Sequence, residues 1–480
     1  MVGREPLANQ APPARRALVG SSVRKRSVAA LLGVPVLLGT AGWAAYTEPW
    51  KDAGSTRPPT TLAGATSSPS PSTDDPTSAA PSTPDPTAAA QTPTPSPEPQ
   101  VLPTGAITAA EASVNPLPAL PRDCHSAPSW ALKAPTNVTR PADGIVARTW
   151  DGTSYFGAPL RLVAVQADFS KVAWSISTAG HLGTTENTKV QTEKSGGAVG
   201  LNGDFFVWGP TGEIPFGVQV VGGEIRFAPA GATRAIGLGD DGKFHYAYVH
   251  VDGAAQVTGA DGAAVKIPIG SVNVSPTKAV SLVTAYGSKQ PFHASWYVLV
   301  RDGVVVSSSP RDPGGPSGKD QLLLAPTSKP SLLSGVKAGS KAVVQAALKS
   351  DYGITFSQAI GSGSEMLRDS RYVGPGCGSQ YGFYTRPRTM VAWNAKDGRF
   401  WLFSAQSTGT GAFHPGNRGL SYSETSDLLR RLGATDAVPL DGGGSTTLIF
   451  KSSNGLTRVD GPSSYPQRPI PDVMVLTPRT

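Results

Sequence analysis

A long stretch without a single aromatic side chain divides this chain. Residues 51–129 contain no Phe, Tyr or Trp, and 16 prolines fall in residues 51–121 among Ser, Thr, Ala and Asp. Such a composition cannot bury enough apolar surface to offset the entropy of ordering the chain. We therefore predict that residues 47–121 form a disordered, semi-extended linker. Residues 122–480 form the folded domain and are numerous enough for a sizeable core.

A basic cluster and an uncharged segment precede the linker. Residues 27–46 carry no charge, and this length matches a helix that spans a bilayer. Because six basic residues lie in residues 1–26 and Glu48 follows the segment, we expect a cytoplasmic basic tail and an extracytoplasmic C-terminal domain. The rival interpretation is a signal peptide, with a weak cleavage site at residues 42–44. We favour a single-pass anchor in the cell membrane; a cleaved chain is secreted.

The charge of the folded part excludes one class of partner. The formal net charge is +8, but six of the basic residues belong to the N-terminal tail. The remainder is close to balanced and has no run of Lys and Arg interleaved with aromatic residues. We therefore expect no nucleic-acid partner.

The chain has only two cysteines, Cys124 and Cys377. In an exported domain an even pair predicts a disulfide, the alternative being two independent thiols. Neither lies in a C-x-x-C or Cys/His pattern with metal-ligand spacing, so we expect no structural metal site and no cofactor.

Short apolar runs separated by turn signals dominate the folded region, which predicts an α+β class with a mostly antiparallel sheet and few helices. One helix is predicted after Ser423 as N-cap, with Gly433 just beyond its end. Part of residues 228–345 is predicted to form an inserted subdomain. The predicted β runs are residues 160–168, 198–206, 217–227, 235–249, 296–306, 388–403, 446–450 and 473–476.

The densest chemical signal is the run Leu-Asp-Gly-Gly-Gly-Ser-Thr-Thr at residues 440–447, which we call the Gly-rich turn. Glycines followed by hydroxyl residues expose backbone N–H groups that suit an anionic oxygen or sugar hydroxyls. An aspartate at the head of such a turn can act as base, nucleophile or hydrogen-bond anchor. The plain alternative is a turn whose aspartate bonds only its own backbone.

This turn and four other segments, in this order and spacing, resemble the phosphodiester glycosidase family over residues 145–476. The turn follows a capped helix ending in Leu-Gly-Ala, and this combination is the specific part of the resemblance. The supporting segments are Asn-Gly-Asp-Phe-Phe at 202–206, Gly-Ser-Gly-Ser-Glu-Met-Leu at 361–367, Arg-Thr-Met-Val-Ala at 388–392 and Arg-Pro-Ile at 468–470.

The resemblance implies a phosphodiester-glycosidase-like fold and hydrolysis of a glycosyl-1-phosphodiester, of the N-acetylglucosamine-1-phosphodiester kind, in a surface or cell-wall glycopolymer. Because a phosphate leaving group is a weak base, charge neutralisation matters more than protonation by a general acid. Asp441 is our first candidate for the catalytic carboxylate and Asp204 the second. The predicted substrate-binding residues are Asn202, Glu365, Arg388, Gly442, Gly443, Gly444, Ser445, Thr446 and Arg468.

The alternative is a non-catalytic carbohydrate-binding, wall-binding or exopolysaccharide-assembly protein that retains the fold. The segment Ser404-Ala405-Gln406 favours it, because family members commonly have an Asp-Gly at that strand end. Metal-assisted attack at phosphorus would require converging Asp and His ligands, and the sequence shows no such cluster.

Overall fold

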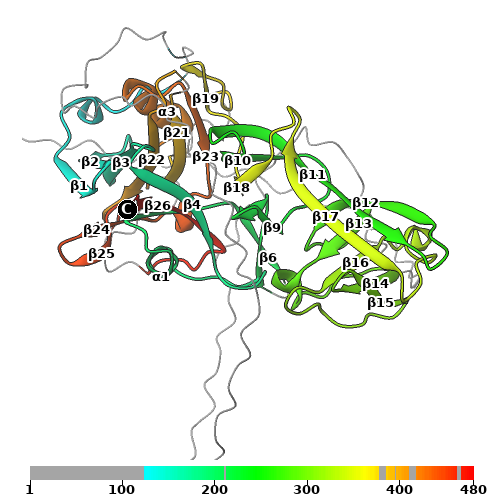
Figure 1. Ribbon diagram of the computed structural model, residues 1–480. Helices are drawn as coiled ribbons and strands as arrows, with labels where there is room; N and C mark the ends of the chain where they lie inside the picture. Colours follow the sequence, from blue (N-terminus) through cyan, green and yellow to red (C-terminus); the bar gives the residue numbers. More distant parts are fainter. Residues whose placement is uncertain are drawn as a thin grey trace, which may run out of the picture. The chain divides into compact units, whose positions relative to one another are not determined.

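The eight-stranded sheet, shown with the other elements in Figure 1, forms one layer of the domain. The computed structural model describes residues 120, 124–209, 212–377, 385–394, 396–409, 418–461 and 466–479. In spatial order, the strands of this sheet are β1 (Asn137–Ala142), β2 (Ile145–Thr153), β3 (Pro159–Ala167), β22 (Phe400–Ser407), β21 (Arg388–Trp393), β23 (Asp436–Pro439), β19 (Leu367–Arg368) and β20 (Arg371–Tyr372).

A five-stranded sheet packs against one face of the eight-stranded sheet. Its strands are β25 (Gly455–Arg458), β24 (Leu448–Ser452), β5 (Val199–Asn202), β26 (Asp472–Pro478) and β4 (Val172–Thr178). Val163 and Val391 of the larger sheet share a buried apolar cluster with Leu201 and Met474 of the smaller one. Because successive side chains of a strand point to opposite faces, the other set of residues in the eight-stranded sheet faces away from this layer.

That other face is covered by helix α3 (Tyr422–Arg431), as Figure 1 shows. Met390 and Phe403 of the sheet pack with Leu428 and Leu429 of the helix. The N-cap is Ser421, two residues before the predicted N-cap Ser423, because Ser421 and Glu424 form a reciprocal capping box. Its end agrees with the prediction, since Gly433 has φ +99° just beyond it.

Helix α1 (Thr188–Lys194) packs on the five-stranded sheet so closely that β5 needs glycine there. A Cβ on Gly200 would lie 1.8 Å from the Thr192 hydroxyl oxygen, which no side chain tolerates. The remaining helical segments are η1 (Ser129–Leu132), η2 (Ala285–Gly287), η3 (Pro330–Leu332) and η4 (Gly443–Ser445).

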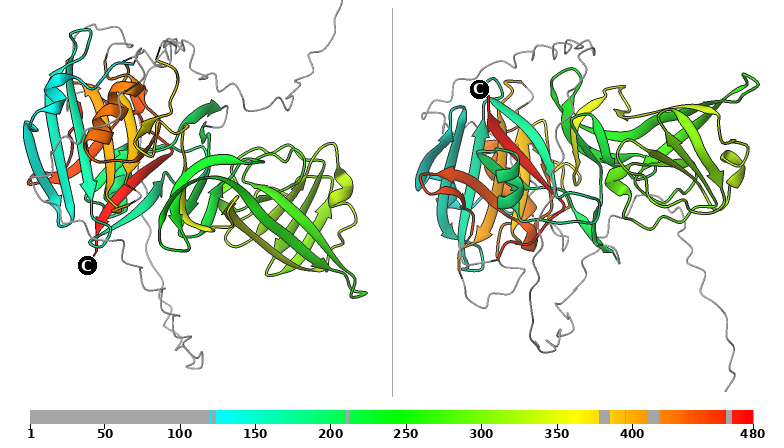
Figure 2. Two further views of the ribbon diagram at one scale, coloured as in Figure 1. Left: turned by 90° about the horizontal axis from the view of Figure 1, so that it is seen from above. Right: turned by 60° about the horizontal axis from the view of Figure 1, so that its bottom comes forward.

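The segment predicted to contain an inserted subdomain supplies most of an eleven-stranded sheet. In spatial order, its strands are β12 (Ala264–Val272), β13 (Val280–Val283), β16 (Gln321–Ala325), β14 (Trp296–Arg301), β15 (Val304–Ser309), β17 (Lys341–Ser350), β11 (Phe244–Thr258), β10 (Thr233–Gly239), β18 (Phe356–Gly361), β8 (Gln219–Val221) and β9 (Glu224–Phe227). An additional β11–β12 pairing closes the strands from β12 to β11 into a ring, seen in green to yellow in Figure 2. A further pair is β6 (Phe206–Gly209) with β7 (Gly212–Pro215).

The prediction of a mostly β, mostly antiparallel domain is confirmed. Among the described strands, β12 and β13 form the one parallel pair, and α1 and α3 are the two α-helices. None of the described helices is long and apolar enough to cross a bilayer. The predicted tail and membrane segment (residues 1–46) and nearly all of the predicted linker (47–121) lie outside the described residues.

Cys124 and Cys377 form a disulfide, with their Cα atoms 4.9 Å apart and a sequence separation of 253. The bond attaches the start of the folded region, before η1 and β1, to the segment that follows β20. A cross-link that closes so long a loop removes many conformations from the unfolded chain.

We expect the double substitution Cys124→Ser/Cys377→Ser to lower the free energy of unfolding by about 2–5 kcal/mol, because the unfolded chain regains this freedom. Urea unfolding of the oxidised protein and of the variant measures the difference. Dithiothreitol should destabilise the parent protein and leave the variant unchanged. Equal unfolding midpoints of parent and variant would contradict the prediction.

Candidate active site around the Gly-rich turn

The Gly-rich turn (residues 440–447) connects β23 of the eight-stranded sheet to β24 of the five-stranded sheet. Asp441 is the second residue after β23, and its backbone N–H donates to the Gly203 carbonyl at 3.1 Å. Residues 443–445 form the single 3₁₀ turn η4. The turn is therefore held where the two sheets meet, with Asp441 at its head.

The Asn202 side chain connects three chain segments at this point. Its Nδ2 donates to the Asp441 carbonyl at 2.6 Å, and its Oδ1 accepts from the Thr389 hydroxyl at 2.9 Å and from the Thr447 N–H at 3.0 Å. Asn202 is fully buried. The Asn202 amide, predicted to bind substrate, contacts protein groups and positions the turn.

Asp441 has a buried carboxylate with a small set of stabilising partners. Burial raises its pKa to about 6, while the Ser445 hydroxyl, the Arg468 charge and the Gly442 N–H act in the opposite direction. A carboxyl group with this pKa is mostly ionised at neutral pH and changes its charge just below it. It can therefore serve as a nucleophile or as a base for water.

Arg468 is the exposed cation beside this carboxylate. Its Nη1 donates to the Ser445 hydroxyl at 3.2 Å, so it lies against the turn. A Cβ on Gly444 would come within 2.4 Å of Arg468 Nη2, so glycine is what lets the guanidinium approach this closely. The structure thus brings together Asp441, Ser445 and Arg468, three of the site residues named in the sequence analysis.

The backbone of the turn is less open than its composition indicated. The N–H of Gly442 bonds the Asp441 carboxylate, and that of Gly443 donates to the Pro387 carbonyl at 2.9 Å. The N–H groups of Ser445 and Thr446 donate to carbonyls within the turn at 3.1 and 3.3 Å. The expected run of free N–H groups for an anionic oxygen is therefore largely taken up inside the protein. The Thr446 side chain is fully buried and accepts from the Thr389 hydroxyl at 3.2 Å, so it too contacts protein groups.

Arg388, one of the predicted substrate-binding residues, has protein partners at the start of α3. Only 4% of the residue is exposed, its Nε donates to the Leu420 carbonyl at 2.9 Å, and its guanidinium carbon lies 3.7 Å from the Tyr422 ring centre. It shares the helix-covered face of β21 with Met390, whereas Thr389 faces Asn202. The guanidinium is therefore assigned to the start of α3 rather than to the Gly-rich turn.

Asp204 is buried in a pair with an aspartate that the sequence analysis missed. Its carboxylate accepts from the N–H groups of Phe205 at 2.7 Å and Gly217 at 2.6 Å, and its own N–H donates to Asp472 Oδ1 at 2.8 Å. Asp472 also accepts a hydrogen bond from the Gln219 side chain. Burial raises the pKa of both carboxyl groups, and the charge of Asp472 raises that of Asp204 further.

These contacts make Asp204 a connection between β5 and the strands β8 and β26, because Gly217 precedes β8 and Asp472 begins β26. The only sequence signal for Asp472 was a carboxylate directly before the apolar run of the last strand. Glu365, another predicted substrate-binding residue, pairs with the exposed Arg368. No group of three His, Cys, Asp or Glu residues among the described ones is arranged to hold a metal ion.

A buried ion pair between Arg458 and Asp460 supports the turn from the β25 side. Arg458 Nε donates to Asp460 Oδ1 at 3.0 Å, and its Nη2 donates to Gln406 Oε1 at 2.8 Å and to the Thr446 carbonyl at 3.0 Å. Burial raises the pKa of Asp460 to about 6 although Arg458 acts against it. Arg458 was not predicted from the sequence, which shows no motif around it.

The raised carboxyl pKa values give stability a defined pH dependence. For Asp441 and Asp460 the folded-state pKa of about 6 exceeds the usual value near 4, so the folded protein binds more protons between these limits. Their contribution to stability is fully present below about pH 4 and is lost as pH rises through about 6. From these groups we expect a higher melting temperature at pH 5 than at pH 8.

Substituting Asp441→Asn should reduce that pH difference by the equivalent of about 1.4 kcal/mol, because one titrating group, with a pKa of about 6 in the folded protein and near 4 in the unfolded chain, is removed. Thermal unfolding of both proteins from pH 5 to pH 8 measures it. Asp240→Asn, a change at an exposed position, is the control and should retain the parent difference. An unaltered pH profile in Asp441→Asn would contradict the assignment.

Comparison with known proteins bears on both the fold and the turn. Residues 294–477 match the family model described as phosphodiester glycosidase. This range contains the Gly-rich turn, Arg388 and Arg468, and it leaves out residues 202–206, which the sequence resemblance had included. No curated protein sequence matches the chain.

Several solved structures are similar to this one. A hypothetical protein from Synechocystis has 17% identity and a TM-score of 0.56, and the match covers 72% of this chain and 64% of that one. A protein of Burkholderia pseudomallei described as exported has 20% identity over 67% of this chain and 75% of that chain, with a TM-score of 0.49. The catalytic domain of zebrafish N-acetylglucosamine-1-phosphodiester alpha-N-acetylglucosaminidase, auto-inhibited by its pro-peptide, has 14% identity over 72% and 87% of the two chains, with a TM-score of 0.38.

The Synechocystis protein therefore shares the fold, and this chain spans about two thirds of its length. The family resemblance that the sequence motifs carried is confirmed: residues 294–477, with the Gly-rich turn inside them, match the phosphodiester glycosidase family.

Proposed function

We propose that the folded domain is a hydrolase that cleaves a glycosyl-1-phosphodiester, of the N-acetylglucosamine-1-phosphodiester kind, in an extracytoplasmic or cell-wall glycopolymer. The observation that carries the proposal is Asp441, a buried carboxylate with a pKa of about 6, beside the exposed guanidinium of Arg468. The family match over residues 294–477 supports the same chemistry. The small separation of an anion and an accessible cation suits a substrate that carries both an electrophilic sugar carbon and a phosphate.

The proposed reaction breaks the bond between sugar C1 and the phosphate oxygen. Water supplies a hydroxyl to C1 and a proton to the products, so a free sugar and a phosphomonoester are released. Asp441 acts on C1, as nucleophile or as base for water. Arg468 neutralises the charge that develops on the departing phosphate, and its planar donor fork fits two phosphate oxygens.

The positioning groups complete this arrangement. Asn202 and Arg458 hold opposite ends of the turn through the Asp441 and Thr446 carbonyls. Asp204 and Asp472 lie buried behind the turn, with the charge of Asp441 contributing to the raised pKa of both. We assign Asp204 to this supporting role, and Asp441 alone to the reacting atoms.

A non-catalytic glycopolymer-binding function is the second candidate. The internal bonding of the Gly442, Gly443, Ser445 and Thr446 N–H groups favours it, because fewer donors are left to stabilise a developing anion. The two candidates differ in one measurable outcome, which is the release of free sugar.

Asp441→Asn should lower the rate of N-acetylglucosamine release from a methyl N-acetylglucosamine-1-phosphodiester by at least about 100-fold, since the reacting carboxylate is lost. Arg468→Gln should lower it by about 10- to 100-fold through the loss of one charged donor. Chromatographic detection of the free sugar measures both. Arg311→Gln, an exposed arginine in the loop between β15 and β16, is the matched control and should retain the parent rate.

Unchanged turnover in Asp441→Asn would overturn the site assignment. No release from this substrate or from UDP-N-acetylglucosamine by the parent protein, with retained binding to wall polymer, would support the binding function instead.

We also propose that residues 27–46 retain the chain in the cell membrane and that residues 47–121 carry the domain outward. Their charge, length and proline content support this arrangement. We expect the mature protein to remain in the membrane pellet after alkaline carbonate extraction and to keep its N-terminal tail. Mass spectrometry checks the N-terminus, and a soluble chain that begins close after Ala44 would show cleavage and contradict retention.

A further inference from the structure

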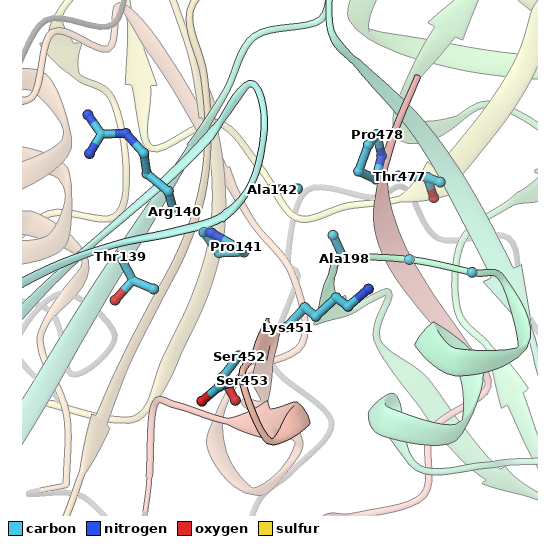
Figure 3. Close-up of a pocket in the computed structure, with 12 residues that line it drawn as sticks. Thr139, Arg140, Pro141, Ala142, Ala198, Lys451, Ser452, Ser453, Thr477 and Pro478 are labelled. Atoms are coloured by element: carbon cyan, nitrogen blue, oxygen red, sulfur yellow. The ribbon is translucent and has the colours of Figure 1, made fainter. Parts of the chain in front are cut away.

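A pocket of about 700 Å³ lies at the opposite end of the five-stranded sheet from the Gly-rich turn, a volume within the range of ligand sites. Figure 3 shows its walls. They come from the end of β1, the turn between α1 and β5, the end of β24 and the end of β26. Its lining residues are Thr139, Arg140, Pro141, Ala142, Gly196, Gly197, Ala198, Lys451, Ser452, Ser453, Thr477 and Pro478.

The chemistry of this lining is cationic and hydroxyl-rich. Arg140 and Lys451 are exposed, and neither forms an ion pair with any of the described residues. Hydroxyl groups of Thr139, Ser452 and Ser453 stand beside them, and the lining contains no Asp or Glu. The pocket therefore carries two positive charges and several hydroxyl groups, a combination that favours a ligand with an anionic oxygen group.

The absence of aromatic residues from the lining narrows the class of anion. Single-stranded nucleic acids are held by bases stacked on aromatic side chains, and this pocket offers none. Its apolar walls are the small residues Ala142 and Ala198 and the rings of Pro141 and Pro478. A phosphate with flexible, hydroxylated neighbours fits this lining better than a planar base.

The two cations are placed differently in the pocket. In Figure 3 the Lys451 side chain extends toward Ala198, while Arg140 stands on the other wall with its guanidinium directed away from Lys451. Arg140 lies where the β1–β2 pairing loses its register between Thr139 and Ala142, and such bulges redirect side chains. Lys451 is therefore the direct contact, and Arg140 adds positive charge at the rim.

The pocket is separate from the candidate active site. β5 extends from beside the pocket at Ala198 to Asn202 at the Gly-rich turn, and four residues of extended strand span about 13 Å. β26 likewise begins at Asp472 near the turn and reaches the pocket at Thr477. A group bound here cannot contact Asp441 directly.

We propose that this pocket is a second binding site, which holds a phosphate group of a phosphodiester-linked glycopolymer. Such a site increases the residence of a polymer on the domain without taking part in bond cleavage. It does not depend on hydrolysis at Asp441, and it applies equally to a catalytic and to a non-catalytic domain.

The test compares the full 480-residue chain with the variant Arg140→Gln/Lys451→Gln. Titration calorimetry at low salt measures binding to a glycerol phosphate oligomer. We expect the variant to bind at least about tenfold more weakly, because the charge-assisted contact of Lys451 and the positive charge of Arg140 at the rim are lost. The difference should shrink at high salt, since exposed charges are screened.

Lys319→Gln/Lys329→Gln is the matched control. It removes the same charge from two exposed lysines outside the pocket, before β16 and at η3, and should bind the oligomer like the parent. Equal binding by the parent and the pocket variant would overturn the proposal, as would an equal loss in the control variant.

Two further probes distinguish the source of the phosphate. Competition by inorganic phosphate at a matched phosphate concentration would show that a single phosphate group is recognised, while competition only by the oligomer would show that the polymer is. A single-stranded oligonucleotide that binds as tightly as the oligomer, and is lost in the pocket variant, would overturn the assignment to a glycopolymer. Turnover of the small methyl phosphodiester should be equal in the parent, the pocket variant and the control variant. A failure of the pocket proposal can therefore be told apart from a failure of the assignment of Asp441.

Discussion

The arrangement around Asp441 depends on one buried amide, that of Asn202. Its three hydrogen bonds connect the end of β5 in the five-stranded sheet, Thr389 on β21 of the eight-stranded sheet, and both ends of the Gly-rich turn. Because each of these groups is removed from water, losing the amide would leave several donors and acceptors unpaired, at a cost of about 1–3 kcal/mol each. The position of the candidate catalytic carboxylate is thus fixed by sheet packing and not by the turn alone.

The site concentrates buried negative charge, and its two arginines offset this in different ways. Asp204, Asp441, Asp460 and Asp472 are all nearly inaccessible to water. Arg458 is buried with Asp460 and stabilises the backbone, whereas Arg468 stays exposed beside Asp441. Removing charged groups from water without full pairing raises carboxyl pKa values, which costs stability at neutral pH. The same burial raises the pKa of Asp441 to about 6, close to the neutral pH at which a general base or nucleophile acts.

Local signals in the sequence predicted local structure well, and the failures concern side-chain direction and distant pairing. The glycine turn, the β runs and the helix end at Gly433 follow from residue types at short spacing. The face occupied by Arg388 depends on strand register, which places it with Met390 under α3 and places Thr389 toward Asn202. Asp472 and Arg458 form hydrogen bonds with residues more than 50 positions away, Gln219 and Gln406 respectively, so nothing near them in sequence indicates their roles. The β11–β17 pairing in the ring joins residues more than 80 positions apart, such as Thr258 and Lys341, and no short motif indicates it.

In the proposed arrangement, with residues 27–46 retained in the membrane, the Cys124–Cys377 bond has a mechanical consequence. Tension along the preceding chain enters the fold at Cys124 and meets a covalent bond before it reaches β1, which pairs only with β2 at the edge of its sheet. Pulling therefore loads Cys377, a buried residue of the segment after β20, rather than peeling the edge strand from the sheet. If the anchored domain also holds an immobile polymer, as proposed, the covalent bond would bear the shear between them and the hydrogen-bonded edge strand would not.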